Sequence, residues 1–430
     1  MEKNKEAKEV DLGTVSVGKL LFQLALPAIT AQIINVLYNM VDRMYIGHLP
    51  GEGANALTGV GVTFPVIMAI SAFAALVSMG GAPRASIMLG KGRKDEAENI
   101  LGNCTTALIT VAVVLTAFFL IFGRRILLMF GASGNTIEYG WAYMQIYSLG
   151  TIFVQLALGL NAFINAQGYA KTGMYTVLIG AICNIILDPI LIFGLFGLPR
   201  LEVAGAALAT VIGQFIAAGL SLFFNLTRNH DIQFRFRGFR PDRGIIARIY
   251  SVGVPSIVMS SIGSVMVFGM NKILISFTEA ATAVFGVYFK LQSFIFMPVF
   301  GLNNGMVPIV AYNYGAGRPD RIVQTIKLSV AAAVTIMLAG LLAFQLAPHI
   351  LLDLFRSEND SGDLLTIGIP ALRIISLSFL FAGYSIVCSS VFQALGHGVL
   401  SLLVSVVRQL VVLLPVAFLL SRASGLAAVW

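Results

Sequence analysis

The chain has 430 residues, of which 57% are hydrophobic and only 11% are charged, with a mean hydropathy of +0.88 and a net charge of +8. A water-soluble domain carries about 25% charged residues, and a single core could not bury this much apolar surface. The composition therefore excludes a soluble globular protein and predicts a chain that is solvated by a lipid bilayer.

Long apolar runs follow one another along the chain, and each could cross the bilayer core as a helix of about 20 residues. The runs do not alternate between apolar and polar residues, so a barrel of strands is not expected. The predicted fold class is therefore an all-α polytopic membrane protein. Eleven spans are predicted, at residues 20–46, 56–82, 100–122, 139–164, 172–196, 203–226, 246–276, 281–306, 324–347, 366–391 and 398–421.

Lysine and arginine are unevenly divided between the two sets of loops. The N-terminal tail and every second loop hold 18 of the 28 basic residues, the opposite loops hold 5, and 5 lie within spans. By the positive-inside rule, the N-terminus and the basic loop at 235–248 are cytoplasmic. We expect this loop to anchor the topology beside anionic lipid headgroups rather than to bind nucleic acid.

Polar residues recur at helical spacing in three of the spans. They are Gln32, Asn35, Asn39 and Asp42 with Tyr38 beside them in the first span, Asn161 and Asn165 in the fourth, and Thr210 and Gln214 in the sixth. Steps of three and four place each group on one face of its helix. Such a face either lines a water-filled cavity or forms hydrogen bonds to a neighbouring helix, and the sequence leaves both readings open.

The fifth span contains a carboxylate, Asp188, among Ile, Leu and Phe residues. An ionisable group inside a bilayer costs several kcal/mol, so its presence favours a functional role over pairing with a buried cation. Asn184 lies on the same helical face, and Pro189 is expected to break the helix locally and free the Ile185 carbonyl. These oxygens predict a site for a proton or a small hard cation such as Na⁺ at Asp188.

The two halves of the chain repeat each other. GKGRKD at 90–95 matches GAGRPD at 315–320 with an offset of 225 residues, and AQG at 166–168 matches ALG at 394–396. The offset covers six helices, so the repeat is parallel. It predicts two pseudo-symmetric six-helix bundles related by an axis along the membrane normal.

The predicted organisation is an N-terminal lobe at 1–226, a basic cytoplasmic linker at 227–245 and a C-terminal lobe at 246–430. VAGAA at 203–207 matches LAAVW at 426–430. The twelfth helix is therefore expected to be truncated shortly after its start.

The second half has no acid where the first has Asp42 and Asp188, but Lys290, Arg373 and Arg408 lie within its spans. They are interpreted as buried counter-ions, interhelical contacts or anion contacts. The four histidines show no metal-ligand spacing, no GxxxxGK[ST] loop occurs, and no nucleophile clusters with a base. We therefore expect no enzyme, no cofactor and no resident metal.

Recognisable motifs lie at residues 27–47, 89–97, 161–168, 184–189 and 203–210. Together they resemble the multidrug and toxic compound extrusion (MATE) family, in particular its MepA-like branch. The resemblance implies two six-helix lobes that export cationic aromatic drugs by alternating access, in exchange for protons or sodium ions. It also implies a cation-coupling site. The implied site residues are Asp42, Asn184, Asp188 and Thr210.

The predicted function is thus a cation-coupled multidrug efflux antiporter, with a flippase for an anionic lipid-linked precursor as the alternative. Neutralisation of the carboxylates is expected to repack the first lobe, with helix 1 bending near Pro27. The expected partners are small-molecule drugs and bilayer lipid, and the protein is expected to act as a monomer in the cytoplasmic membrane. The expected substrate-cavity residues are Gln32, Asn35, Tyr38, Asn39, Asn161 and Asn165.

Overall fold

The computed structural model describes residues 11–227, 231–234, 241–355 and 363–430. The described residues form helices and connecting turns, without a strand, which confirms the all-α prediction. The linker predicted at 227–245 and the basic loop at 235–248 lie partly outside the described residues.

The first half of the chain contains nine α-helices and one short 3-10 turn among its described residues. They are α1 (Val17–Gly47), α2 (Gly53–Phe73), α3 (Ala75–Ser78), α4 (Ala82–Gly90), α5 (Lys94–Met129), α6 (Ile137–Leu149), α7 (Thr151–Ala166), α8 (Ala170–Phe193), η1 (Leu195–Gly197) and α9 (Glu202–Thr227).

The second half follows the same plan, with fewer interruptions near its start. Its elements are α10 (Arg243–Leu274), α11 (Glu279–Gly315), α12 (Pro319–Leu346), α13 (Pro348–Asp353), α14 (Asp363–Ser376), α15 (Phe379–Ala394), α16 (Gly398–Val406), the π-helical segment η2 (Val407–Leu413), α17 (Leu414–Ser424) and α18 (Leu426–Val429). α18 begins where the repeat predicts the start of the twelfth helix.

Nine helical stretches in the described residues are long and apolar enough to cross a membrane, and two bent pairs raise the number to eleven. The predicted number of spans is thus reproduced, but two of them bend sharply between two helices. The span predicted at 139–164 is α6 and α7, which meet at 54°, and the span predicted at 366–391 is α14 and α15, which meet at 49°.

Local contacts explain both bends. A Cβ atom at Gly150, between α6 and α7, would overlap the Val211 side chain of α9. The bend therefore lies at a glycine, whose lack of a side chain allows close contact with α9. Between α14 and α15, the hydroxyls of Ser376 and Ser378 donate to the carbonyls of Arg373 and Ile375 at 3.0 and 2.8 Å. Such serine bonds compete with the regular helix ladder.

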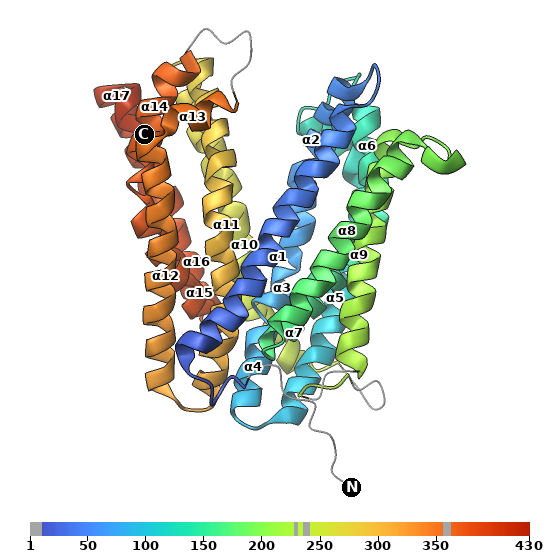
Figure 1. The fold of residues 1–430 in the computed structure, drawn as a ribbon, viewed down its shortest axis with the longest axis vertical. Helices are drawn as coiled ribbons and strands as arrows, with labels where there is room; N and C mark the ends of the chain where they lie inside the picture. Colours follow the sequence, from blue (N-terminus) through green and yellow to red (C-terminus); the bar gives the residue numbers. More distant parts are fainter. Residues whose placement is uncertain (1–10, 228–230, 235–240, 356–362) are drawn as a thin grey trace.

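The helices form two groups that correspond to the two halves of the sequence (Figure 1). The groups meet toward the lower end of the view and spread apart toward the upper end, while α1 slants across from the first group toward the second. α1 packs closely on α11, since a Cβ at Gly305 would lie 2.6 Å from the Ala25 Cα atom. The arrangement agrees with the predicted pair of bundles.

The backbone carries the same repeat as the sequence. Gly92 and Gly317, which end the two matched basic turns, have φ values of +73° and +66°. Gly168 and Gly396, which end AQG and ALG, have φ values of +94° and +86°. Because only glycine adopts this region readily, both halves need glycine at the same two turns.

The prolines do not interrupt the helices that contain them. α1 continues through Pro27, and α8 continues through Pro189, so the break predicted beside Asp188 is absent. Pro189 still lacks an N–H, which leaves the Ile185 carbonyl without its usual donor from that position. Packing of α8 against its neighbours maintains the helical path.

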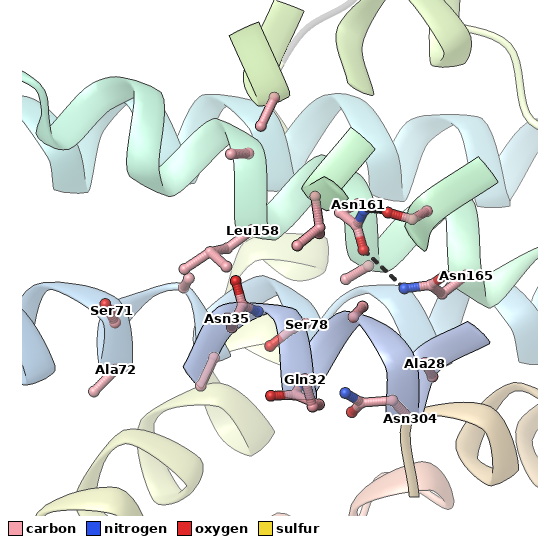
Figure 2. Close-up of a pocket in the computed structure, with 18 of the residues that line it drawn as sticks. Ala28, Gln32, Asn35, Ser71, Ala72, Ser78, Leu158, Asn161, Asn165 and Asn304 are labelled. Atoms are coloured by element: carbon pink, nitrogen blue, oxygen red, sulfur yellow. Dashed lines mark hydrogen bonds between the residues drawn. The ribbon is translucent and has the colours of Figure 1, made fainter. Parts of the chain in front are cut away.

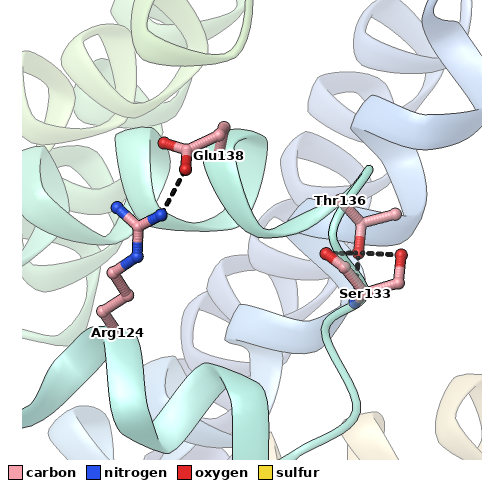
Figure 3. Close-up of polar contacts among 4 residues, drawn as sticks. All are labelled: Arg124, Ser133, Thr136 and Glu138. Atoms are coloured by element: carbon pink, nitrogen blue, oxygen red, sulfur yellow. Dashed lines mark hydrogen bonds and ion pairs between the residues drawn. The ribbon is translucent and has the colours of Figure 1, made fainter.

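The turn that joins α5 to α6 is tied by polar contacts (Figure 3). Arg124 pairs with Glu138, and the Ser133 backbone N–H donates to Thr136 Oγ1 at 2.9 Å. These contacts fix the start of α6, the helix that carries Tyr143.

Candidate functional site

Four residues predicted to form a cation site come together from α1, α8 and α9. Asp42, Asn184, Asp188 and Thr210 have exposed fractions of 6%, 2%, 0% and 6%. The Asn184 amide nitrogen lies 3.2 Å from Asp188 Oδ1 and 3.4 Å from Thr210 Oγ1, and it donates to both. Asp42 lies within electrostatic range of Asp188. We call these four residues the acidic site.

Three oxygen atoms of the acidic site have no hydrogen-bond donor among the residues that the structure describes: Asp42 Oδ1, Asn184 Oδ1 and Asp188 Oδ2. Within the described part of the chain, no ion pair joins either carboxylate to a lysine or arginine. An unpaired charge in a low-dielectric interior costs several kcal/mol. A proton or a small cation would supply the missing partner. The alternative of a buried counter-ion for Asp188 is thus not observed among these residues.

The carboxylates alone are too few for a typical transition-metal site. No cluster of three or more His, Cys, Asp or Glu side chains occurs among the described residues. A hard cation such as Na⁺ would therefore use amide and hydroxyl oxygens as well, and such ligands suit it.

Two glycines allow α8 and α9 to approach closely enough to build this site. A Cβ at Gly180 would lie 2.8 Å from the Gly213 carbonyl oxygen, and a Cβ at Gly213 would lie 2.7 Å from the Gly180 oxygen. A Cβ at Gly213 would also come within 3.2 Å of the Asn184 Cβ atom. The close approach of the two backbones places Asn184 within reach of Thr210.

Tyrosines complete the surroundings of the acidic site. Tyr38, which lies beside the predicted polar face of α1, interacts with Asp42 and Asp188. Tyr143 of α6 is 4% exposed and interacts with Asp42 and Thr210. Tyr143 was not predicted from the sequence, because an aromatic residue in an apolar run cannot be distinguished by spacing from a packing residue.

A cavity of about 830 Å³ adjoins the acidic site. Residues of α1 to α4 and of α7 to α9 line it from the first half, and residues of α10 and α11 line it from the second; Figure 2 shows part of this wall. Asn184 and Thr210 are part of its wall, whereas Asp42 and Asp188 are not. Asn184 thus belongs to the cavity wall and also contacts the buried carboxylate.

Five of the six residues predicted for a substrate cavity line this one: Gln32, Asn35, Tyr38, Asn161 and Asn165. Asn39 is the exception. Its side chain is exposed, and its amide donates to the Asn35 carbonyl of the same helix at 2.6 Å.

The asparagines of α7 line the cavity and also form hydrogen bonds to a neighbouring helix. Asn161 Nδ2 donates to the Gly173 carbonyl and to Thr176 Oγ1, both at 2.7 Å, and Asn161 Oδ1 accepts from Asn165 at 2.8 Å. Figure 2 shows the bond between the two asparagines. Asn161 therefore ties α7 to α8 while it lies at the cavity wall.

The cationic residues of the second half are not buried counter-ions. Lys290, Arg373 and Arg408 are all exposed, and none of them lines the cavity. Lys290 lies 5.5 Å from the centre of the Phe355 ring, and Arg408 donates to Ser385 Oγ at 2.8 Å. Arg408 thus makes an interhelical contact.

Comparison with known proteins agrees with this architecture. The MatE family model matches twice, at residues 27–190 and 255–419, which is one match for each half. The chain is 28% identical over 414 residues to the multidrug export protein MepA of Staphylococcus haemolyticus, covering 96% of this chain and 89% of that protein. The MepA protein of Staphylococcus aureus strain MSSA476 is 27% identical, with the same coverage.

A solved structure has the same fold. It is described as the outward-facing conformation of a multidrug resistance MATE family transporter of the MOP superfamily. It matches with a TM-score of 0.90 at 24% identity, covering 99% of this chain and 93% of that chain. Because the family model covers most of both repeats, the chain belongs to the MatE family.

Proposed function

We propose that the protein is an antiporter that exports drugs from the cytoplasm in exchange for protons or sodium ions. The observation that carries the proposal is the position of Asn184. Its amide nitrogen donates to a fully buried, otherwise unpaired carboxylate, and the residue also forms part of the cavity wall. Any ion that binds Asp188 therefore acts on a residue that faces the drug.

The proposed exchange follows from charge compensation. A proton or Na⁺ that reaches Asp42 and Asp188 neutralises them, which favours a different packing of α1, α8 and α9 around Asn184. Drug binding favours the state in which the carboxylates are ionised. Exchange requires that ion and drug favour different states, because a ligand shifts an equilibrium only by its differential affinity.

The substrates in this proposal are cationic aromatic or amphipathic compounds. Two carboxylates behind the cavity wall create a negative potential that attracts cations without contacting them. The curated relatives are named multidrug export proteins, which supports a drug substrate. The proposed setting is the cytoplasmic membrane, with the N-terminus in the cytoplasm and the protein as a monomer.

Transport by the purified protein in liposomes tests the proposal. A pH gradient or a sodium gradient is imposed separately, and movement of ethidium is followed by fluorescence. One gradient is expected to drive transport in the unaltered protein, and Asp188→Asn is expected to abolish that dependence. Asp353→Asn, an exposed acid outside the cavity, is the control. Transport that follows neither gradient, or that survives Asp188→Asn, would contradict the proposal.

A further inference from the structure

The side chains that line the cavity carry no Asp, Glu, Lys, Arg or His among the described residues. Among the described residues, seven carboxamides line it instead, and only two aromatic rings, Tyr38 and Phe130, do so. The 30 phenylalanines and 15 methionines of the chain do not dominate the wall, since only one Phe and three Met belong to it. A substrate in this cavity meets neutral hydrogen-bonding groups, and no ionised partner contacts it directly.

Four of the seven carboxamides are already used within the protein. Asn161 and Asn165 bond each other, and Asn161 also bonds α8. Asn184 bonds Asp188 and Thr210, and Gln214 interacts with Tyr38. These four amides hold the helices of the cavity wall in place, but few of their donors and acceptors remain to form hydrogen bonds with a ligand.

The other three carboxamides are Gln32, Asn35 and Asn304. Their side chains make no hydrogen bond within the described part of the chain, and all three are partly exposed. Figure 2 shows them in the same region of the cavity. Gln32 and Asn35 lie on α1 of the first half, whereas Asn304 lies on α11 of the second.

α1 and α11 are in direct contact beside these amides. A Cβ at Gly301 would lie 2.5 Å from the Ile29 Cα atom, and Gln32 and Asn304 each follow this contact by three residues. Each amide offers two N–H donors and one carbonyl acceptor. We call Gln32, Asn35 and Asn304 the amide patch, and it extends over residues of both halves of the protein on the cavity wall.

We propose that the amide patch selects substrates by hydrogen bonds to their uncharged donors and acceptors, and that Asn304 is a specificity-determining residue of the second lobe. This inference rests on the proposed function. The favoured class is flat compounds with amino, hydroxyl or carbonyl groups. The positive charge of a substrate is attracted by the buried carboxylates at a distance, whereas the hydrogen bonds determine which cation stays.

Two cationic substrates separate hydrogen bonding from charge. Ethidium carries two amino groups, whereas tetraphenylphosphonium carries a positive charge and no hydrogen-bonding group. Transport of each is measured in liposomes for Asn304→Leu, Asn304→Gln and Gln32→Leu. Gln324→Leu is the matched control, because Gln324 is exposed on α12 and does not line the cavity.

A neutral hydrogen bond contributes about 0.5–1.5 kcal/mol, so its loss corresponds to a change of about twofold to tenfold. We expect Asn304→Leu and Gln32→Leu each to raise the KM for ethidium by that factor and to leave the KM for tetraphenylphosphonium unchanged. Asn304→Gln is expected to restore most of the affinity for ethidium.

An equal rise in the KM for both substrates in the two Leu variants would overturn the inference, because it would show that the amides only maintain the structure of the cavity wall. Unchanged KM values for ethidium would overturn it as well. If the unaltered protein moved neither compound under any gradient, the proposed function itself would fail, and the inference with it.

Discussion

Gly90 of α4 and Gly315 of α11 pack against each other's helices where the two groups of helices meet. A Cβ atom at Gly90 would overlap the Tyr312 carbonyl oxygen, and a Cβ at Gly315 would overlap the Ile87 carbonyl oxygen. The two glycines are equivalent in the sequence repeat, and so are Ile87 and Tyr312. The two halves therefore close one end of the molecule through a pseudo-symmetric contact between backbones.

Gly315→Ala is expected to weaken this closure and shift the protein toward a state that is open at that end. Overpacking of this kind costs about 1–3 kcal/mol, which shifts a two-state equilibrium about fivefold or more. Spin labels at the exposed positions Lys91 and Tyr314 would report the separation. Gly286→Ala, on the same helix with no atom within 4 Å of the added Cβ, should leave the distance unchanged. An unaltered distance in Gly315→Ala would show that the contact does not hold the end closed.

Gly213→Ala is expected to weaken the binding of the coupling ion. The new Cβ would press on the Gly180 carbonyl and on Asn184, which would lengthen the 3.4 Å contact between Asn184 and Thr210. The same overpacking range predicts a loss of about tenfold in the apparent affinity for the ion. The measurement is the ion concentration that gives half-maximal transport.

Gly219→Ala is the control for this variant, because Gly219 lies on the same helix and its added Cβ meets no atom within 4 Å. Equal ion affinity in Gly213→Ala and Gly219→Ala would contradict the role given to the close approach of α8 and α9.

Arg321→Gln is expected to loosen the segment that precedes α1. Arg321 donates to the carbonyls of Leu12 and Val15 at 3.2 and 2.7 Å and to Asn313 Oδ1 at 3.0 Å. Hydrogen bonds from charged groups contribute about 1.5–3 kcal/mol. Thermal unfolding in detergent should therefore begin at a lower temperature, and a protease should cut residues 11–16 faster. Unchanged cleavage and unfolding would show that the guanidinium does not hold this segment.

The helices could be predicted well from the sequence, because a helix that is exposed to lipid needs a long run of apolar residues. The sequence also predicted Asp188 and Asn184 correctly as neighbours, since residues four apart share a helical face. The repeat in the basic turns was confirmed by the positive φ values of Gly92 and Gly317.

Other features depend on contacts between distant segments, which spacing does not reveal. The bend at Gly150 requires the Val211 side chain of another helix, and the position of Tyr143 depends on the packing of α6. Likewise, Asn161 and Gln32 looked alike in the sequence. Only the structure separates the amide that joins two helices from the amide with an open hydrogen-bonding capacity.

The central claim is that the buried carboxylate Asp188 couples ion entry to drug export. The most direct measurement is energy-dependent efflux of ethidium from cells that lack other exporters, with the unaltered protein and with Asp188→Asn at equal expression. The account predicts efflux for the unaltered protein and its loss, to the level of cells without the transporter, for Asp188→Asn. Efflux that persists at an unchanged rate in Asp188→Asn would contradict the account, because Asp188 would then serve only the structure.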